Sequence, residues 1–94
     1  MAELKNHPAV RIARDSFARF REGKIDAAGL QQNLSTALGL LDNSLPKAVQ
    51  ESISWAENEI EGVRFMTNAA EQPAEVDRVW REVQEVLARH DSAE

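Results

Sequence analysis

The side chains of this chain that suit proton transfer or metal binding are two histidines and a scatter of carboxylates. His7 and His90 lie near opposite ends of the 94-residue sequence, so no local element holds both. Glu57 and Glu61 share one side of a helix, as metal-binding carboxylates do in bundles, but no Glu-x-x-His motif accompanies them. Phosphate-binding, dinucleotide-binding, zinc-protease and serine-hydrolase motifs are absent as well. We therefore expect no enzymatic activity, no bound metal and no cofactor.

The same helical segment offers a surface for binding another protein. The carboxylates of Glu51, Glu57 and Glu61 and the amide of Asn58 fall on its polar side. Phe65 lies beside them, roughly opposite the apolar side, and an exposed aromatic ring next to acidic groups is a plausible binding hot spot. Two plainer interpretations stay open: the carboxylates form a solvated helix face, and the turn after the helix covers Phe65. The docking interpretation makes these five residues the partner-binding set.

Trp55, Met66 and Trp80 define a second candidate surface. They lie at the margins of apolar stripes, where large side chains belong more often to a core or a subunit interface than to a ligand platform. As an interface, they would pack across the two-fold axis of a homodimer. A structural or regulatory homodimeric helical bundle is accordingly the alternative to a module that binds a different protein.

The formal net charge of −5 is unevenly distributed. Residues 1–47 hold seven Lys/Arg and five Asp/Glu, a balance of +2, whereas residues 48–94 hold four Arg and eleven Asp/Glu, a balance of −7. An acidic second half argues against nucleic acid as a ligand, because phosphate contacts need a basic surface, and it suits a basic protein partner. Glu59 interrupts an apolar stripe, so we expect it at the rim, paired with an arginine such as Arg19 or Arg21.

Apolar periodicity predicts an all-α protein. The clearest stripe recurs every three or four residues and consists of Leu45, Val49, Ile53, Ala56, Ile60 and Val63. Similar patterns predict helices over about 8–22, 26–42, 45–70 and 73–90. Short connections make successive helices antiparallel, so residues 1–94 are expected to form a single domain, an antiparallel up-down four-helix bundle. A three-helix body whose fourth helix packs on another subunit is the structural alternative.

Capping residues mark where these helices should begin and end. They are Asn6 or His7 as the first N-cap, Gly23 as a left-handed C-cap, Asp26 as the second N-cap and Ser44 as the third. Whether the 45–70 helix runs unbroken through Gly62 stays open.

Cysteine usage and hydropathy indicate the cellular environment. The chain has no cysteine, so it can form neither a disulfide nor a thiolate metal site. No apolar stretch typical of a secretory signal opens it, and no apolar run approaches the ~20 residues that span a bilayer. We expect a cytoplasmic protein without membrane contact.

One segment carries a family resemblance. Phe17-Ala-Arg-Phe20-Arg-Glu-Gly23-Lys-Ile25-Asp26-Ala27-Ala-Gly-Leu30 resembles the opening of bacterial colicin-like immunity proteins, in which the first helix ends in an aromatic-x-x-Gly-x-Ile-x-Ala pattern. The resemblance implies an inhibitor that presents carboxylates to the cationic active site of a basic toxin nuclease. The chain departs from the family in its second helix, which is not acidic: its polar side carries Gln31, Gln32 and Asn33. A toxin-binding surface would therefore lie on the third and fourth helices.

Overall fold

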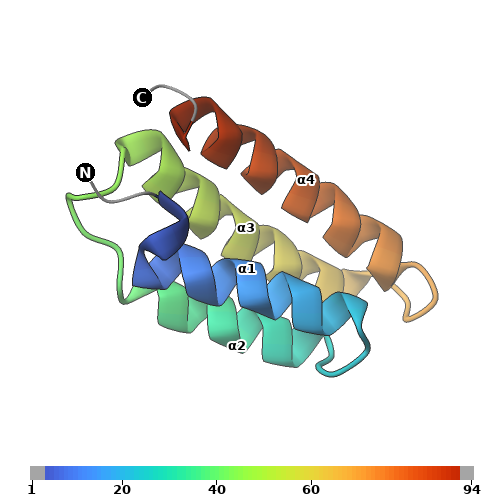
Figure 1. Ribbon diagram of the computed structural model, residues 1–94. Helices are drawn as coiled ribbons and strands as arrows, with labels where there is room; N and C mark the ends of the chain where they lie inside the picture. The colour runs from blue at the N-terminus through green and yellow to red at the C-terminus, as the bar shows by residue number, and fades with distance from the viewer. Residues whose placement is uncertain (1–3, 92–94) are drawn as a thin grey trace.

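Four α-helices make up most of residues 4–91, the part of the chain that this computed structural model describes. After a short 3-10 turn, η1 (Leu4–Asn6), they are α1 (Pro8–Arg21), α2 (Ala27–Leu38), α3 (Lys47–Met66) and α4 (Gln72–Asp91). Successive helices run in opposite directions, and the α1–α2 and α3–α4 connections lie at the same end of the bundle (Figure 1). The predicted antiparallel four-helix bundle is confirmed.

Each helix packs mainly on its neighbours in sequence. α2 lies against both α1 and α3, α4 lies against α3, and α1 and α4 have far less contact with each other. The short connections cause this arrangement, since a helix that reverses direction within a few residues must return along the one before it. Because α4 packs on α3 of its own chain, the alternative of a three-helix body with an externally docked fourth helix is wrong.

The core follows the apolar stripe of α3, as the sequence predicts. Val49, Ile53, Ala56, Ile60 and Val63 are all at most 5% exposed, because residues three and four apart return to the same side of a helix.

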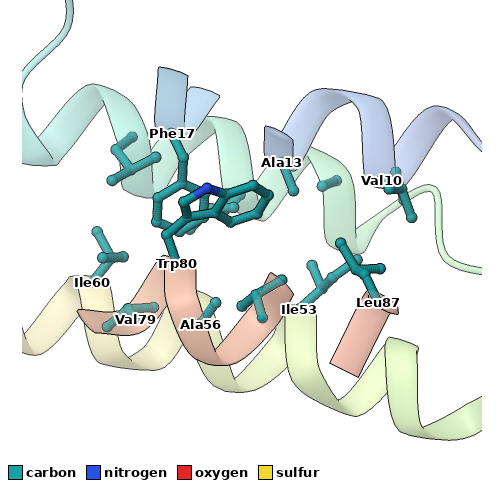
Figure 2. Packing of buried hydrophobic residues seen from close by; sticks show 14 of the residues in the cluster. Val10, Ala13, Phe17, Ile53, Ala56, Ile60, Val79, Trp80 and Leu87 are labelled. Carbon is teal, nitrogen blue, oxygen red and sulfur yellow. The ribbon is translucent and has the colours of Figure 1, made fainter. Parts of the chain in front are cut away.

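An aromatic pair extends the core between α1 and α4, two helices that have few direct contacts. The rings of Phe17 on α1 and Trp80 on α4 stack with their centroids 4.8 Å apart and an interplanar angle of 21°. Figure 2 shows the two rings overlapping in the middle of the buried cluster. This stack is an apolar contact between α1 and α4.

Side-chain caps fix the beginnings of the first two helices. The Nδ1 atom of His7 accepts a hydrogen bond from the Ala9 amide at 3.1 Å, and Oδ1 of Asp26 accepts one from the Gly29 amide at 2.9 Å. Gly23 follows α1 with a φ of 77°, a conformation that favours glycine. Among the residues proposed as caps, His7, Gly23 and Asp26 are confirmed.

The second helix is shorter than its apolar pattern predicts. α2 ends at Leu38 rather than at residue 42, because its last turn tightens: the Gly39 amide donates to the carbonyls of Ser35 and Thr36 at 3.3 and 3.1 Å. Leu40 lies beyond this turn and is 41% exposed.

The third helix begins later and ends earlier than predicted. It starts at Lys47 after Pro46, and the prediction that Ser44 caps it is wrong, because the Ser44 hydroxyl bonds to Asp42 instead. It continues without a break through Gly62.

The end of α3 is set by the turn that follows it. α3 stops at Met66, four residues before the predicted limit, since Thr67 is extended and the Gln72 amide bonds to the Asn68 carbonyl at 3.2 Å. That bond turns the chain directly into α4.

Candidate functional site

The outer face of α3, which we define as Glu51, Asn58, Glu61, Gly62 and Phe65, lies away from the buried stripe. Gly62 is partly exposed and the other four are exposed. The carboxylates of Glu51 and Glu61 form no ion pair or hydrogen bond with any other residue in the described part of the chain. They therefore remain available to a cationic group from outside.

Phe65 gives this face an apolar anchor. The turn into α4 leaves Phe65 67% exposed, and the neighbouring Met66 is 87% exposed. The Arg64 guanidinium lies 4.6 Å from the centre of the Phe65 ring, a cation–π contact. Arg64 is in turn held by a 3.0 Å hydrogen bond from its Nη1 atom to Oε1 of Gln31. One neighbour of the ring is thus fixed by α2.

Glu57 lies apart from the other predicted partner-binding residues. Its Oε2 atom accepts hydrogen bonds from Nε2 of Gln31 at 3.1 Å and from the Ser35 hydroxyl at 3.3 Å, both on α2. With the Arg64–Gln31 bond, these contacts form a continuous polar seam between α2 and α3. The structure therefore ties Glu57 to the packing of two helices and leaves Glu51, Asn58, Glu61 and Phe65 together on the outer face.

Gly62 lies in the middle of the outer face and leaves the helix backbone there without a side chain. A Cβ atom added there would meet no heavy atom within 4 Å, so packing within the described chain does not require glycine. Glycine in a helix costs about 0.5–1 kcal/mol relative to alanine. Its presence next to exposed aromatic and acidic groups fits a surface that the backbone of another molecule approaches closely.

A groove of about 300 Å³ between α3 and α4 adjoins the outer face. It is lined by Ala48, Glu51, Ser52 and Trp55 of α3 and by Glu82, Glu85, Val86 and Arg89 of α4. Sequence reasoning assigned Glu51 and Trp55 to two different surfaces, and the structure places them on one wall. It missed Glu82 and Glu85, because their relevance appears only once α4 is known to lie beside that wall. Three carboxylates and one guanidinium give the groove an acidic balance.

The three residues of the second candidate surface do not come together. Trp80 is only 6% exposed and stacks on Phe17 inside its own chain, so its prediction as a subunit-interface residue is wrong. Trp55 is partly buried against the core and lines the α3–α4 groove, whereas Met66 is exposed at the end of α3.

Glu59 lies at the rim, but its partner differs from the one predicted. Nη2 of Arg78 on α4 lies 3.2 Å from Oε1 of Glu59, and the same guanidinium contacts Glu75 at 3.2 Å and Glu82 at 3.5 Å. The hydrogen bond to Glu59 is the main cause that raises the pKa of Arg78. Arg19 and Arg21 are wrong as partners because α4, and not α1, lies on that side of α3.

Ser44, Asp42 and His7 have the residue types of a hydrolase triad without its geometry. The Ser44 amide and hydroxyl both donate to Oδ1 of Asp42, and Nε2 of His7 lies 3.2 Å from the same oxygen. These bonds to Ser44 are the main causes that lower the pKa of Asp42. Since the hydroxyl bonds to the carboxylate and Nδ1 of His7 caps α1, no base is placed on the nucleophile. The network instead ties the start of α1 to the α2–α3 connection.

Residues 4–91 contain no group of three or more His, Cys, Asp or Glu side chains placed to hold a metal ion. No helix within that range is long and apolar enough to cross a membrane.

Comparisons with family models, with curated proteins and with solved structures find no match to the chain.

Proposed function

We propose that this chain is a non-enzymatic protein-interaction module that binds a basic protein through the outer face of α3. The observation that carries the proposal is the exposed Phe65 ring beside the unpaired carboxylate of Glu61. An aromatic anchor surrounded by polar groups is the usual composition of a binding hot spot. The adjoining α3–α4 groove adds the carboxylates of Glu51 and Glu85 to the same acidic surface.

Phe65 and the carboxylates would contribute to binding in different ways. Burying a phenylalanine side chain contributes ~1.5–3 kcal/mol of apolar transfer, which acts mainly on the rate of dissociation. Carboxylates at the rim of an interface attract a basic partner and raise the rate of association, and salt screens this attraction. Binding should therefore weaken as salt rises but should not disappear.

The sharpest form of this proposal is inhibition of a basic toxin domain in the cytoplasm, in the manner of an immunity protein. Its support is the resemblance of residues 17–30 to colicin-like immunity proteins, together with the position of the free carboxylates on α3 and α4 rather than on α2. The carboxylates would occupy a cationic active site and exclude its anionic substrate.

Two variants and two matched controls test the docking face. Glu61→Lys reverses a charge on the outer face, and Asp15→Lys makes the same change on the exposed side of α1. Phe65→Ala removes the proposed anchor, and Leu40→Ala removes an exposed apolar side chain at the end of α2. Each tagged protein is used to recover binding partners from the lysate of its own host, with circular dichroism as the check on folding.

The expected result is one basic protein recovered at near-equal stoichiometry by the wild type and both controls, and lost with the two outer-face variants. The activity of the recovered protein, measured with and without this chain, then tests inhibition. Equal recovery by all four variants would show that the outer face of α3 is not the binding surface.

A homodimer is the second candidate, and the 87% exposure of Met66 is the observation that favours it. The effect of salt distinguishes the two functions. Binding of a basic partner should weaken as salt rises, whereas self-association should strengthen, because screening reduces the repulsion between two chains of net charge −5. Light scattering of the purified protein should then show a dimer that Met66→Ala weakens. Trp80→Ala is unsuitable for this test, because that ring belongs to the core.

A further inference from the structure

The cleft between α1 and α4 is a hollow that the proposed function leaves unused. It has a volume of about 360 Å³ and lies at the end of the bundle where the α1–α2 and α3–α4 connections are. Phe17 and Trp80, whose stacked rings appear in Figure 2, form part of its wall with Val76. Phe20, Ile25 and Pro73 complete its apolar lining; Phe20 and Ile25 are only partly buried and Pro73 is exposed. The folded chain thus keeps an apolar surface there that water reaches.

The arrangement of the helices explains why this cleft exists. α1 packs on α2 and α4 packs on α3, whereas α1 and α4 have few direct contacts with each other. The Phe17–Trp80 stack joins them at one level, and nearer the end of the bundle no described side chain fills the space between Phe20 and Val76. Pockets that bind small molecules have ~300–1,000 Å³ and are mostly apolar with a few polar groups. This cleft falls at the lower end of that range.

An ion pair at the edge of the cleft supplies the polar groups. Nε of Arg21 lies 3.6 Å from Oδ1 of Asp77, and the side chains are 59% and 50% exposed. The two terminal nitrogens of the Arg21 guanidinium donate no hydrogen bond to any other residue among 4–91. A carboxylate can therefore bind them in a two-pronged geometry while Nε stays beside Asp77.

We propose that the α1–α4 cleft binds a small apolar monocarboxylate, with its hydrocarbon or aromatic body between Phe20 and Trp80 and its carboxylate on Arg21. The proposal is independent of protein binding by α3, since no residue of the outer face lines this cleft. The lining determines the ligand class: the apolar side chains suit a body about the size of one ring, and Arg21 suits one negative charge.

Two probes that differ only in charge test the proposal. 3-Phenylpropionate carries the carboxylate, and 3-phenylpropanamide is its neutral analogue of nearly the same shape. Each is titrated into the ¹⁵N-labelled full chain and followed by amide chemical shifts. We expect saturable shifts confined to residues 17–25 and 73–80, with the acid binding about tenfold more tightly than the amide because a charged hydrogen-bonding pair forms only with the acid.

Three variants assign the difference to one side chain. Arg21→Gln should bring the affinity of the acid down to that of the amide and leave the amide unchanged, whereas Arg89→Gln, the same charge change in the α3–α4 groove, should alter neither. Asp77→Asn should raise the affinity of the acid by removing a nearby negative charge. Exposed ion pairs contribute little to folding, so all three variants should keep the wild-type spectrum outside the cleft.

Four results would overturn the proposal: no saturable binding of either probe, equal affinity of both probes, shifts located away from residues 17–25 and 73–80, or an acid affinity that Arg21→Gln leaves unchanged. None of these results bears on Glu61 or Phe65, so protein binding by α3 would stand or fall separately.

Discussion

Gly62→Ala should make this protein more stable. The glycine lies inside α3, and an added Cβ atom would meet nothing within 4 Å. The methyl group therefore displaces no neighbour, and alanine restricts the unfolded chain while it fits the helix.

The size of the effect follows from helix propensity. Replacing glycine by alanine in a helix contributes about 0.5–1 kcal/mol. In a domain of this size, that gain raises the melting temperature by about 2–8 °C. Gly23→Ala is the matched control: its φ of 77° is unfavourable for alanine, so the same chemical change should lower stability by about 1 kcal/mol.

Urea unfolding followed by circular dichroism measures both variants. Gly62→Ala should move the midpoint to higher urea with an unchanged slope, which identifies a change in stability rather than in the unfolded ensemble. A midpoint equal to or below that of the wild type would refute the reasoning, because it would mean that position 62 is packed or strained within the chain.

The same variant links stability to binding. If a partner approaches the backbone at Gly62, the added methyl group should weaken binding to α3 while it stabilises the free chain. A variant that is more stable and binds equally well would leave the protein-binding role of the other outer-face residues intact but remove that of Gly62.

Two further predictions concern the core and the α2–α3 connection. Trp80→Ala should destabilise the fold by about 3–5 kcal/mol, because it removes a buried ring and its stack on Phe17; a loss below 1 kcal/mol in urea unfolding would show that the stack does not join α1 to α4. Because the pKa of Asp42 is lowered, the ionised carboxylate contributes to stability above its ordinary pKa of 3.8, and this contribution is lost as the pH falls through the lowered pKa. Urea midpoints measured from pH 6 downward should therefore fall less steeply for Asp42→Asn than for the wild type, and parallel curves would contradict this.

Periodicity and capping chemistry were sufficient to predict the core of the fold. The buried stripe of α3 follows from helical spacing alone, and His7 and Asp26 cap their helices because their side chains reach the free amides of the first turn. The end of α2 could not be predicted in the same way, because Leu40 and Leu41 continue the apolar composition beyond the last helical hydrogen bond.

The candidate site was harder to predict, because a helix pattern does not say which neighbour lies on which side. Glu57 and Glu59 stand two residues apart, yet Glu57 bonds to α2 and Glu59 to Arg78 of α4. Phe65 could be assigned to the side opposite the core, but only the turn after Met66 determines that it is exposed. The α3–α4 groove depends on residues from two helices and is absent from either pattern alone.

The pairing of each helix with its neighbour in sequence has a kinetic consequence. Contacts between helices that follow each other in the chain close short loops, so each pairing costs little chain entropy, and helical bundles rich in such local contacts fold in microseconds to milliseconds. The contacts of Phe17 with Trp80 and of Arg21 with Asp77 join α1 to α4, which are distant in sequence. Because these contacts are few, we expect them to open first in the native state, so amide hydrogen exchange should be faster in α4 than in α3.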